Sequence, residues 1–329
     1  MRIIITGASG FIGRQLVDTL VRQPTLTDDA GNRRTVEEVM CLDLSVPEIA
    51  CDAPFLLRHV QSDLSSEAAL LNLVTPDVGV VFHLASVVSA VAENDFDLGM
   101  AVNLDGTRRL LEACRRTGSR PRFVLASSVA VFGGGSEDVV TDATSVSPRT
   151  SYGAQKAICE LLVGDYSRKG YVEGCALRLP TVIVRPGKPN GAASTFASSI
   201  IREPLHGIRV NCPVAPQTAL YVSSPRTVVS ALLHAAELPL PAWSAGRTLN
   251  LPGIRVTVAQ LMTALAAVAG TDRMDLISWE RDPFVEEIVS RWPSRFAPTR
   301  ARSLGFLEDA DAEQIVRQFV EDHMTASRL

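Results

Sequence analysis

The chain has 329 residues, of which 46% are hydrophobic and 21% are charged, and its formal net charge is −4. This composition is typical of a soluble globular protein long enough for one large domain and a smaller one. The acidic balance argues against nucleic acid or anionic membrane as a partner. The sequence contains no run of 18 apolar residues, and its first segment, MRIIITGASGFIG, fails as a signal peptide, so we expect a cytoplasmic protein.

Strands and helices are expected to alternate up to about residue 184. Short apolar runs predict strands at 2–6, 36–44, 55–64, 78–86, 122–133 and 174–184. Helical spacing predicts helices at 10–23, 97–118 and 150–162. Apolar strands joined by helical crossovers are typical of an α/β fold, a doubly wound parallel sheet covered on both faces.

The composition changes after residue 184, where the proline- and glycine-rich stretch RPGKPNGAAS (185–194) begins. Further helices are expected at 195–202, 225–237, 257–269 and 312–323. We therefore predict a nucleotide-binding domain over 1–184 and a smaller, mainly substrate-binding cap over 185–329. Strands near 218–222 and 247–251 can return to the main sheet.

The six cysteines, at 41, 51, 114, 159, 175 and 212, are scattered and form no C-x-x-C motif. They are interpreted as buried thiols in a reducing cytoplasm. The five histidines show no metal-ligand spacing, so no metal is expected, and His83 is interpreted as a packed strand histidine.

The segment TGASGFIG carries Gly7, Gly10 and Gly13 directly after the first strand and into the first helix. Glycines at this spacing allow a tight turn, bring backbone N–H groups close to a pyrophosphate, and place the anion at a helix N-terminus. The pattern predicts a dinucleotide site, the alternative being a tight turn with no ligand.

Asp43, at the end of the second expected strand, is predicted to accept the adenosine ribose hydroxyls. A carboxylate there favours NAD over NADP, because it would repel a 2′-phosphate. Arg33 and Arg34 argue the other way and are interpreted as solvated loop charges. Asp63 is placed to contact adenine, with a helix N-cap as an equal alternative.

Tyr152 and Lys156 lie four residues apart in the segment TSYGAQKAICELL, so a helix brings them to one face. A free phenol is a poor base at neutral pH, but a fixed cation beside it favours the phenolate. The pair is a candidate general base for a hydroxyl proton. A surface tyrosine beside a solvated lysine is the alternative.

With TGASGFIG, HLAS, ASSVAVFG, SYGAQK and LRLPTV in this order, the chain resembles the extended short-chain dehydrogenase/reductase family over nearly its whole length. That family includes nucleotide-sugar epimerases and dehydratases. The resemblance implies a Rossmann-type fold, an NAD cofactor and a catalytic Ser-Tyr-Lys set.

The resemblance implies a role for each matched residue. The catalytic hydroxyl falls on Ser128, with Ser127 as the weaker choice, and Tyr152 and Lys156 complete the set. Asn103 would brace the site, with an ordinary helix-interior asparagine as the alternative. The other expected cofactor contacts are Ser9, Phe11, Ile12, Leu84, Ala85 and Pro180.

The segment 177–207 distinguishes among members of the family. Sugar-nucleotide enzymes usually read LRxxNvyG here, whereas this chain has Thr181 in place of the asparagine. The segment instead resembles the D-erythronate dehydrogenase group, which implies NAD-dependent oxidation at C2 of a four-carbon sugar acid. A nucleotide-sugar epimerase or dehydratase with recycled NAD is the alternative, and a non-catalytic NAD sensor is disfavoured by the intact Ser-Tyr-Lys set.

A small acid needs a cation or several hydrogen bonds to hold its carboxylate. The loop after residue 184 offers Arg185, Lys188 and Asn190, while Arg178 is interpreted as structural. Each loop residue has an equal alternative as a solvated side chain or cap. The expected substrate-binding residues are Ser86, Ser128, Tyr152, Thr181, Arg185 and Asn190.

The family resemblance suggests a homodimer formed through the helices at 97–118 and 151–168. Apolar residues on the second faces of these helices are Leu110, Leu111, Ile158 and Leu162. The same positions are also compatible with a core within one chain.

Overall fold

The protein is described here by a computed structural model that covers residues 1–45, 52–64, 66–134, 138–187 and 194–324. It divides into two compact units that interleave along the chain. The first unit comprises Met1–Ser128, Thr150–Arg178 and Val229–Leu249. The second unit comprises Val129–Arg149, Leu179–Val228 and Asn250–Leu329.

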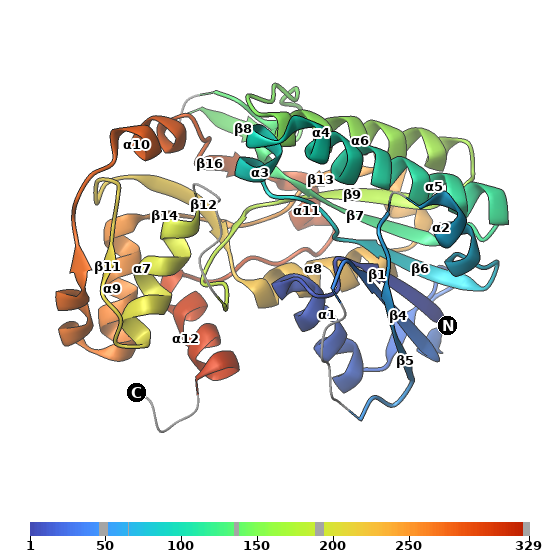
Figure 1. The fold of residues 1–329 in the computed structure, drawn as a ribbon, viewed down its shortest axis with the longest axis horizontal. Helices are drawn as coiled ribbons and strands as arrows, with labels where there is room; N and C mark the ends of the chain where they lie inside the picture. The colour runs from blue at the N-terminus through green and yellow to red at the C-terminus, as the bar shows by residue number, and fades with distance from the viewer. Residues whose placement is uncertain (46–51, 65, 135–137, 188–193, 325–329) are drawn as a thin grey trace. The chain divides into compact units, whose positions relative to one another are not determined.

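A seven-stranded sheet forms the centre of the first unit (Figure 1). Its strands, in spatial order, are β13 (Thr248–Asn250), β9 (Glu173–Leu179), β7 (Arg122–Ser128), β6 (Val78–His83), β1 (Arg2–Thr6), β4 (Glu38–Asp43) and β5 (Leu56–Gln61). The pairs β1–β4, β1–β6, β4–β5 and β6–β7 are parallel. Ile3, Ile4 and Ile5 are all fully buried, as strands covered on both faces require. The predicted doubly wound α/β fold is confirmed.

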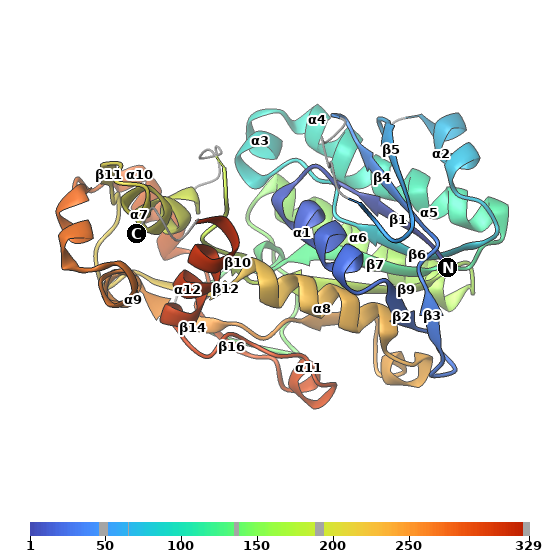
Figure 2. The same ribbon diagram turned by 90° about the horizontal axis from the view of Figure 1, so that it is seen from below.

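Helices cover both faces of this sheet. One face carries α2 (Glu67–Leu73), α5 (Gly106–Thr117) and α6 (Ser151–Arg168), and the other carries α1 (Phe11–Arg22) and α8 (Pro225–Glu237) (Figures 1 and 2). An apolar core between sheet and helices includes Ile4, Val81, Leu110, Leu125 and Val163. Packing thus fixes α6, with Tyr152 and Lys156, against the sheet.

The helix predicted over 97–118 is present, but its hydrogen-bonding pattern changes along its length. The structure has α4 (Phe96–Gly99), a π-helical turn (Met100–Asp105) and then α5. The Asn103 carbonyl accepts hydrogen bonds from Thr107 Oγ1 at 2.6 Å and Cys159 Sγ at 3.2 Å. These side chains satisfy a backbone oxygen inside the widened turn, a local effect that helical periodicity does not reveal.

Residues 25–35, where Arg33 and Arg34 were expected in a loop, form a β-hairpin. Its strands are β2 (Thr25–Thr27) and β3 (Arg33–Thr35), which pair antiparallel. A second element that the reading missed is the short helix α3 (Ser89–Asn94).

The strand predicted over 174–184 is broken at Pro180, which has no N–H to donate to a ladder. Its first part is β9, and its second part is β10 (Thr181–Val182). β10 pairs parallel with β12 (Ala219–Ser223), and β12 pairs antiparallel with β14 (Ile254–Thr257). Of the two later strands considered for the main sheet, β13 joins it and β12 does not.

The second unit packs helices around its own apolar core. The helices α7 (Thr195–Leu205), α9 (Val258–Ala269) and α12 (Ala312–His323) contribute Ile200, Leu261 and Phe319 to it. Smaller elements are α10 (Pro283–Ser290), α11 (Thr299–Ser303) and the strand pairs β8 (Val139–Thr141) with β16 (Arg295–Ala297) and β11 (Val210–Asn211) with β15 (Ile277–Ser278). The four helices predicted after residue 194 are present.

The described cysteines at 41, 114, 159, 175 and 212 are all buried, while Cys51 lies outside the described residues. Burial raises the pKa of the Cys114 and Cys175 thiols to about 12. No helix in the described part of the chain has both the length and the apolar character needed to cross a membrane.

Candidate active site

The glycine turn after β1 is packed too closely for side chains. Gly7 has a left-handed backbone with φ of 72°, and a Cβ there would lie 2.7 Å from the Ala85 nitrogen. Its N–H donates to the Leu42 carbonyl at 2.9 Å. Gly10 is the N-cap of α1 and provides no side-chain cap. A Cβ on Gly13 would overlap the backbone of Ala8 at 2.7 Å. The turn therefore has the close backbone approach and uncapped helix end that fit a pyrophosphate.

Asp43 lies beside this turn and holds it in place. Its Oδ2 accepts the Ser9 N–H at 2.8 Å, and its Oδ1 accepts the Leu44 N–H at 2.7 Å. A carboxylate has about four lone-pair sites, so two backbone contacts leave capacity for further donors. Local sequence patterns do not predict the contact with Ser9, because the two residues are far apart in the chain.

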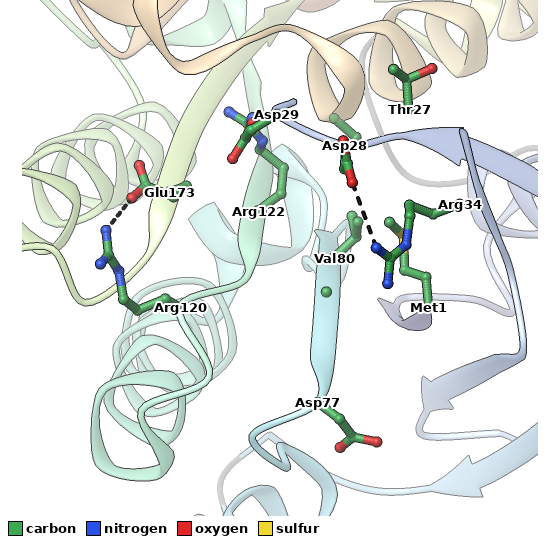
Figure 3. A pocket seen from close by; sticks show the side chains of 12 residues that line it. Met1, Thr27, Asp28, Asp29, Arg34, Asp77, Val80, Arg120, Arg122 and Glu173 are labelled. Atoms are coloured by element: carbon green, nitrogen blue, oxygen red, sulfur yellow. Dashed lines mark hydrogen bonds and ion pairs between the residues drawn. The ribbon is translucent and has the colours of Figure 1, made fainter. Parts of the chain in front are cut away.

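Arg33 and Arg34 lie toward the amino-terminal edge of the main sheet, opposite to the carboxyl edge where Asp43 lies. Arg34 lines a hollow of about 280 Å³ with Met1, Gly79 and Arg122, residues at the amino-terminal starts of β1, β6 and β7 (Figure 3). Within this hollow Arg34 faces Asp28 at 3.8 Å. Asp43 instead ends β4 at the carboxyl edge, where open α/β sheets bind their ligands. Arg33 and Arg34 thus do not offset the charge of Asp43.

Residues after β6 connect the glycine turn to Asn103. The Leu84 N–H donates to the Thr6 carbonyl at 3.1 Å, and the Ala85 N–H donates to Thr6 Oγ1 at 3.2 Å. Ser86 Oγ donates to Asn103 Oδ1 at 2.8 Å. The predicted residues Ala85, Ser86 and Asn103 are therefore brought together.

Asn103 is buried and uses its side chain fully. Its Oδ1 also accepts the Val87 N–H at 2.9 Å, and its Nδ2 donates to the Val87 carbonyl at 3.2 Å and to Gln155 Oε1 at 2.8 Å. Gln155 lies on α6, next to Lys156. Asn103 thus joins the loop after β6 to α6 and is not an ordinary helix-interior residue.

Lys156 is 2% exposed and is anchored to the sheet. Its Nζ donates to the Ala126 carbonyl at 2.9 Å, on β7 and two residues before Ser128. The same Nζ lies 5.7 Å from the centroid of the Tyr152 ring. The cation is therefore a buried, oriented group beside the phenol and not a solvated surface lysine.

The two serines at the end of β7 have different environments. Ser127 is buried, and its Oγ donates to Glu160 Oε1 at 2.5 Å. Glu160 also forms an ion pair with Arg178 at 2.7 Å, which agrees with the structural interpretation of Arg178. Successive residues of a strand face opposite sides, so Ser128 points away from this network. The contact with Glu160 occupies Ser127 and leaves Ser128 as the stronger candidate.

The remaining cofactor candidates of the first unit lie near the turn. Phe11 and Ile12 form the start of α1. Asp63 is exposed after β5, and the N-cap of α2 is Ser66, whose side chain accepts the Ala69 N–H. The capping alternative considered for Asp63 is therefore wrong for α2.

The remaining site candidates, from Pro180 onwards, belong to the second unit. Thr181 pairs with Val222 in the three-stranded sheet, and Pro180 is buried beside Gly253. The N–H of Arg185 donates to Ser198 Oγ at 3.4 Å, and its carbonyl accepts from Arg202 Nη1 at 2.8 Å. Lys188 and Asn190 lie outside the described residues.

Val184, immediately before Arg185, has a left-handed backbone with φ of 55° and is buried. This conformation is rare for a β-branched residue and persists only where the surroundings impose it. The sugar-nucleotide pattern LRxxNvyG ends in glycine at this position. The hydrogen bonds of the Arg185 backbone N–H with Ser198 and of its carbonyl with Arg202 explain how the turn is maintained.

Sequence reasoning missed Gln155, Glu160 and Thr6 as supporting residues. Glu160 follows Lys156 by four residues, so helical spacing was an available signal for it. Thr6 carried no signal, because its partners are distant in sequence.

The chain matches the NAD dependent epimerase/dehydratase family over residues 3–218. It is 50% identical over 322 residues to a D-erythronate dehydrogenase from Cupriavidus necator, with 98% of each chain covered. It is 42% identical over 324 residues to a D-erythronate dehydrogenase from Haemophilus influenzae, with coverage of 98% of this chain and 100% of the relative.

Solved structures share the fold. A nucleoside-diphosphate-sugar epimerase from Agrobacterium tumefaciens aligns with a TM-score of 0.91 and 40% identity, covering 98% of this chain and 94% of that one. L-threonine 3-dehydrogenase from Trypanosoma brucei aligns with a TM-score of 0.82 and 24% identity over 97% and 96% of the two chains, a likeness of fold alone.

We predict that Asp43 sets a preference for NADH over NADPH. Asp43→Asn removes the charge but keeps an amide oxygen for the Ser9 N–H, so the preference should narrow by roughly tenfold through tighter NADPH binding. Dissociation constants for both dinucleotides, measured by fluorescence titration, test this. Asp43→Ala is the matched control, because it also loses the anchor of the turn and should lower the unfolding temperature further. Equal affinity of the unaltered protein for the two dinucleotides would contradict the assignment.

Proposed function

The chain belongs to the NAD-dependent epimerase/dehydratase family, and from this we propose that it oxidises the C2 hydroxyl of a small sugar acid, D-erythronate, to the 2-oxo acid with NAD. The observation that carries the proposal is the buried ammonium of Lys156 beside Tyr152 and anchored to the strand of Ser128. The identities to D-erythronate dehydrogenases support the substrate class.

Oxidation of a carbinol removes one hydride and one proton. Bound NAD supplies the hydride acceptor. The protein must accept the proton, and Tyr152 takes it from the C2 hydroxyl as the general base. Lys156 places its positive charge beside the phenol, and Ser128 orients the hydroxyl by a hydrogen bond. The Lys156 ammonium has three N–H donors. One of them binds the Ala126 carbonyl, so two remain for the cofactor ribose.

Most of the residues proposed to hold NAD belong to the first unit. The turn of Gly7, Gly10 and Gly13 with Ser9, Phe11 and Ile12 would bind the pyrophosphate, and Asp43 the adenosine ribose. The backbone of Leu84 and Ala85 packs against that turn and would line the dinucleotide. The other proposed cofactor contacts are Asp63, which would lie near adenine, Asn103 and Pro180.

Arg185 is proposed to hold the carboxylate of the substrate. Burial, followed by the charge of Arg202, lowers the pKa of its guanidinium. A bound carboxylate would offset both effects, and a charge-assisted bond is what a small anionic substrate needs. Ser86, Thr181 and Asn190 are proposed as further substrate contacts.

A nucleotide-sugar epimerase with recycled NAD is the second candidate. It is favoured by the 40% identity to the Agrobacterium tumefaciens structure. Thr181 and Val184 depart from the sugar-nucleotide pattern at its asparagine and glycine, and the identity to the D-erythronate dehydrogenases is higher. We therefore place the dehydrogenase first.

We also propose a cytoplasmic homodimer. On α6, Leu161 is 74% exposed and Ile158 is 41% exposed, which provides apolar surface for a partner copy. Leu110 and Leu111 are fully buried in the chain's own core, and Leu162 packs against that core. The interface expected from the sequence is therefore restricted to the outer face of α6.

Tyr152→Phe is expected to remove turnover while leaving NAD binding intact, because it deletes only the phenolic oxygen. Loss of a general base typically lowers the rate by about 10²–10⁴-fold. Steady-state rates and a dinucleotide titration measure the two effects. Ser128→Ala should also lose turnover, whereas Ser127→Ala should retain it and lower stability, because Glu160 loses a partner. A Tyr152→Phe enzyme with near-normal turnover would refute the mechanism.

The substrate prediction compares D-erythronate with its neutral alcohol, erythritol. The acid should be oxidised and the alcohol should not, because only the acid can pair with a cation. Arg185→Gln should raise the KM for the acid by roughly tenfold or more with a smaller effect on kcat. Arg209→Gln is a matched control, since Arg209 is an exposed arginine outside the proposed site. Equal oxidation of erythritol would exclude carboxylate recognition.

The dimer prediction uses Leu161→Glu, which places a charge in the proposed interface. The substitution should convert a dimer into a monomer, and light scattering after gel filtration measures the mass. Leu307→Glu is the matched control, because Leu307 is also 74% exposed but lies in the second unit. A monomeric unaltered protein would refute the proposal.

A further inference from the structure

A buried hydrogen-bond chain passes through His83 at the end of β6. The His83 Nδ1 lies 2.6 Å from Thr6 Oγ1, and its Nε2 lies 2.8 Å from Thr107 Oγ1. Thr6, His83 and Thr107 are each essentially inaccessible to solvent. Both ring nitrogens therefore have a protein partner, and the chain joins β1, β6 and α5.

The partners at the two ends determine the direction of every bond. The Thr107 hydroxyl donates its proton to the Asn103 carbonyl, so it can only accept from His83. His83 must then carry its proton on Nε2 and accept at Nδ1 from the Thr6 hydroxyl. Thr6 Oγ1 in turn accepts the Ala85 N–H. In this tautomer each of the four hydrogen bonds has one donor and one acceptor, whereas the other tautomer would leave two acceptors, Nε2 and the Thr107 oxygen, facing each other.

His83 has no acid or base role in this arrangement. Its burial, and then the charge of Lys156, lower its pKa to about 3. The ring therefore stays neutral at any pH near 7, which the fixed tautomer requires.

The two ends of the chain lie at the two halves of the candidate active site. At one end Ala85 packs against the Gly7 turn. At the other end, Asn103 binds Ser86 and Gln155 through its side chain, and its carbonyl also accepts from Cys159 on α6. A change of the His83 tautomer or rotamer would disturb both ends.

We infer that His83, as the neutral Nε2–H tautomer, is a positioning residue that fixes the dinucleotide turn relative to the segment around Asn103 and α6. The sequence suggested only that His83 is a packed strand histidine, and a positioning role goes beyond that. It rests on the proposed binding of NAD but not on the identity of the substrate. Without the relay, the turn would occupy its binding-competent arrangement for a smaller fraction of the time, and the apparent affinity for dinucleotide would fall in proportion.

Nitrogen-15 NMR of histidine-labelled protein tests the tautomer directly. The His83 signals should show a neutral ring protonated on Nε2, unchanged from about pH 5 to pH 9. They are assigned by substituting the other four histidines, at positions 59, 206, 234 and 323, one at a time. An Nδ1–H tautomer, or a ring that titrates in this range, would overturn the inference.

Thr107→Val tests the positioning role, because valine keeps the shape and removes the partner of the Nε2–H. The dissociation constant for NADH should rise roughly three- to tenfold. Thr117→Val is the matched control on the same helix. Its hydroxyl also donates to a carbonyl four residues earlier, that of Ala113 at 2.9 Å, but it is outside the relay.

Both variants should lose some thermal stability, and only Thr107→Val should lose affinity. Equal NADH affinity in the two variants would show that the relay is merely structural and would overturn the positioning role. Because neither measurement uses a sugar acid, failure of the substrate proposal would leave both results interpretable. Absence of NADH binding by the unaltered protein would instead refute the proposed function.

Discussion

The buried ammonium of Lys156 is the constraint on which the site depends. A cation removed from water is costly unless a hydrogen bond or a charge compensates it. Here the Ala126 carbonyl is one partner, which ties α6 to β7 at the level of Ser128. The same bond directs the ammonium to the Tyr152 ring. Removal of this contact would leave the ammonium without its anchor on the strand that carries the proposed hydroxyl, while core packing and the bond between Ser127 and Glu160 still hold the helix.

Several buried polar groups in this part of the first unit carry no charge. His83 remains neutral, and Asn103 and Gln155 contribute amides. The buried carboxylate of Glu160 is one turn further along α6 and is paired with Arg178. In the proposed mechanism, this separation leaves the ammonium to act on the phenol and on the cofactor.

The sequence predicted the fold class and the order of the main strands and helices well, because apolar strands and helical spacing are local signals. It also singled out Tyr152 and Lys156 and the glycine turn, whose chemistry follows from residue type and spacing. It did not predict the π turn at Asn103 or the hairpin at 25–35. The π turn depends on Thr107 and Cys159 reaching one carbonyl. Likewise, the bond between Asp43 and Ser9 joins residues that only the folded sheet brings together.

The most direct test of the account is whether free NADH accumulates. Purified protein is incubated with excess NAD and D-erythronate, and the absorbance of NADH is followed beyond one equivalent per enzyme. We predict that the concentration of free NADH rises in proportion to the acid consumed over many turnovers. A signal limited to one equivalent, or conversion of a sugar nucleotide with no NADH released, would contradict it and favour an epimerase that recycles its cofactor.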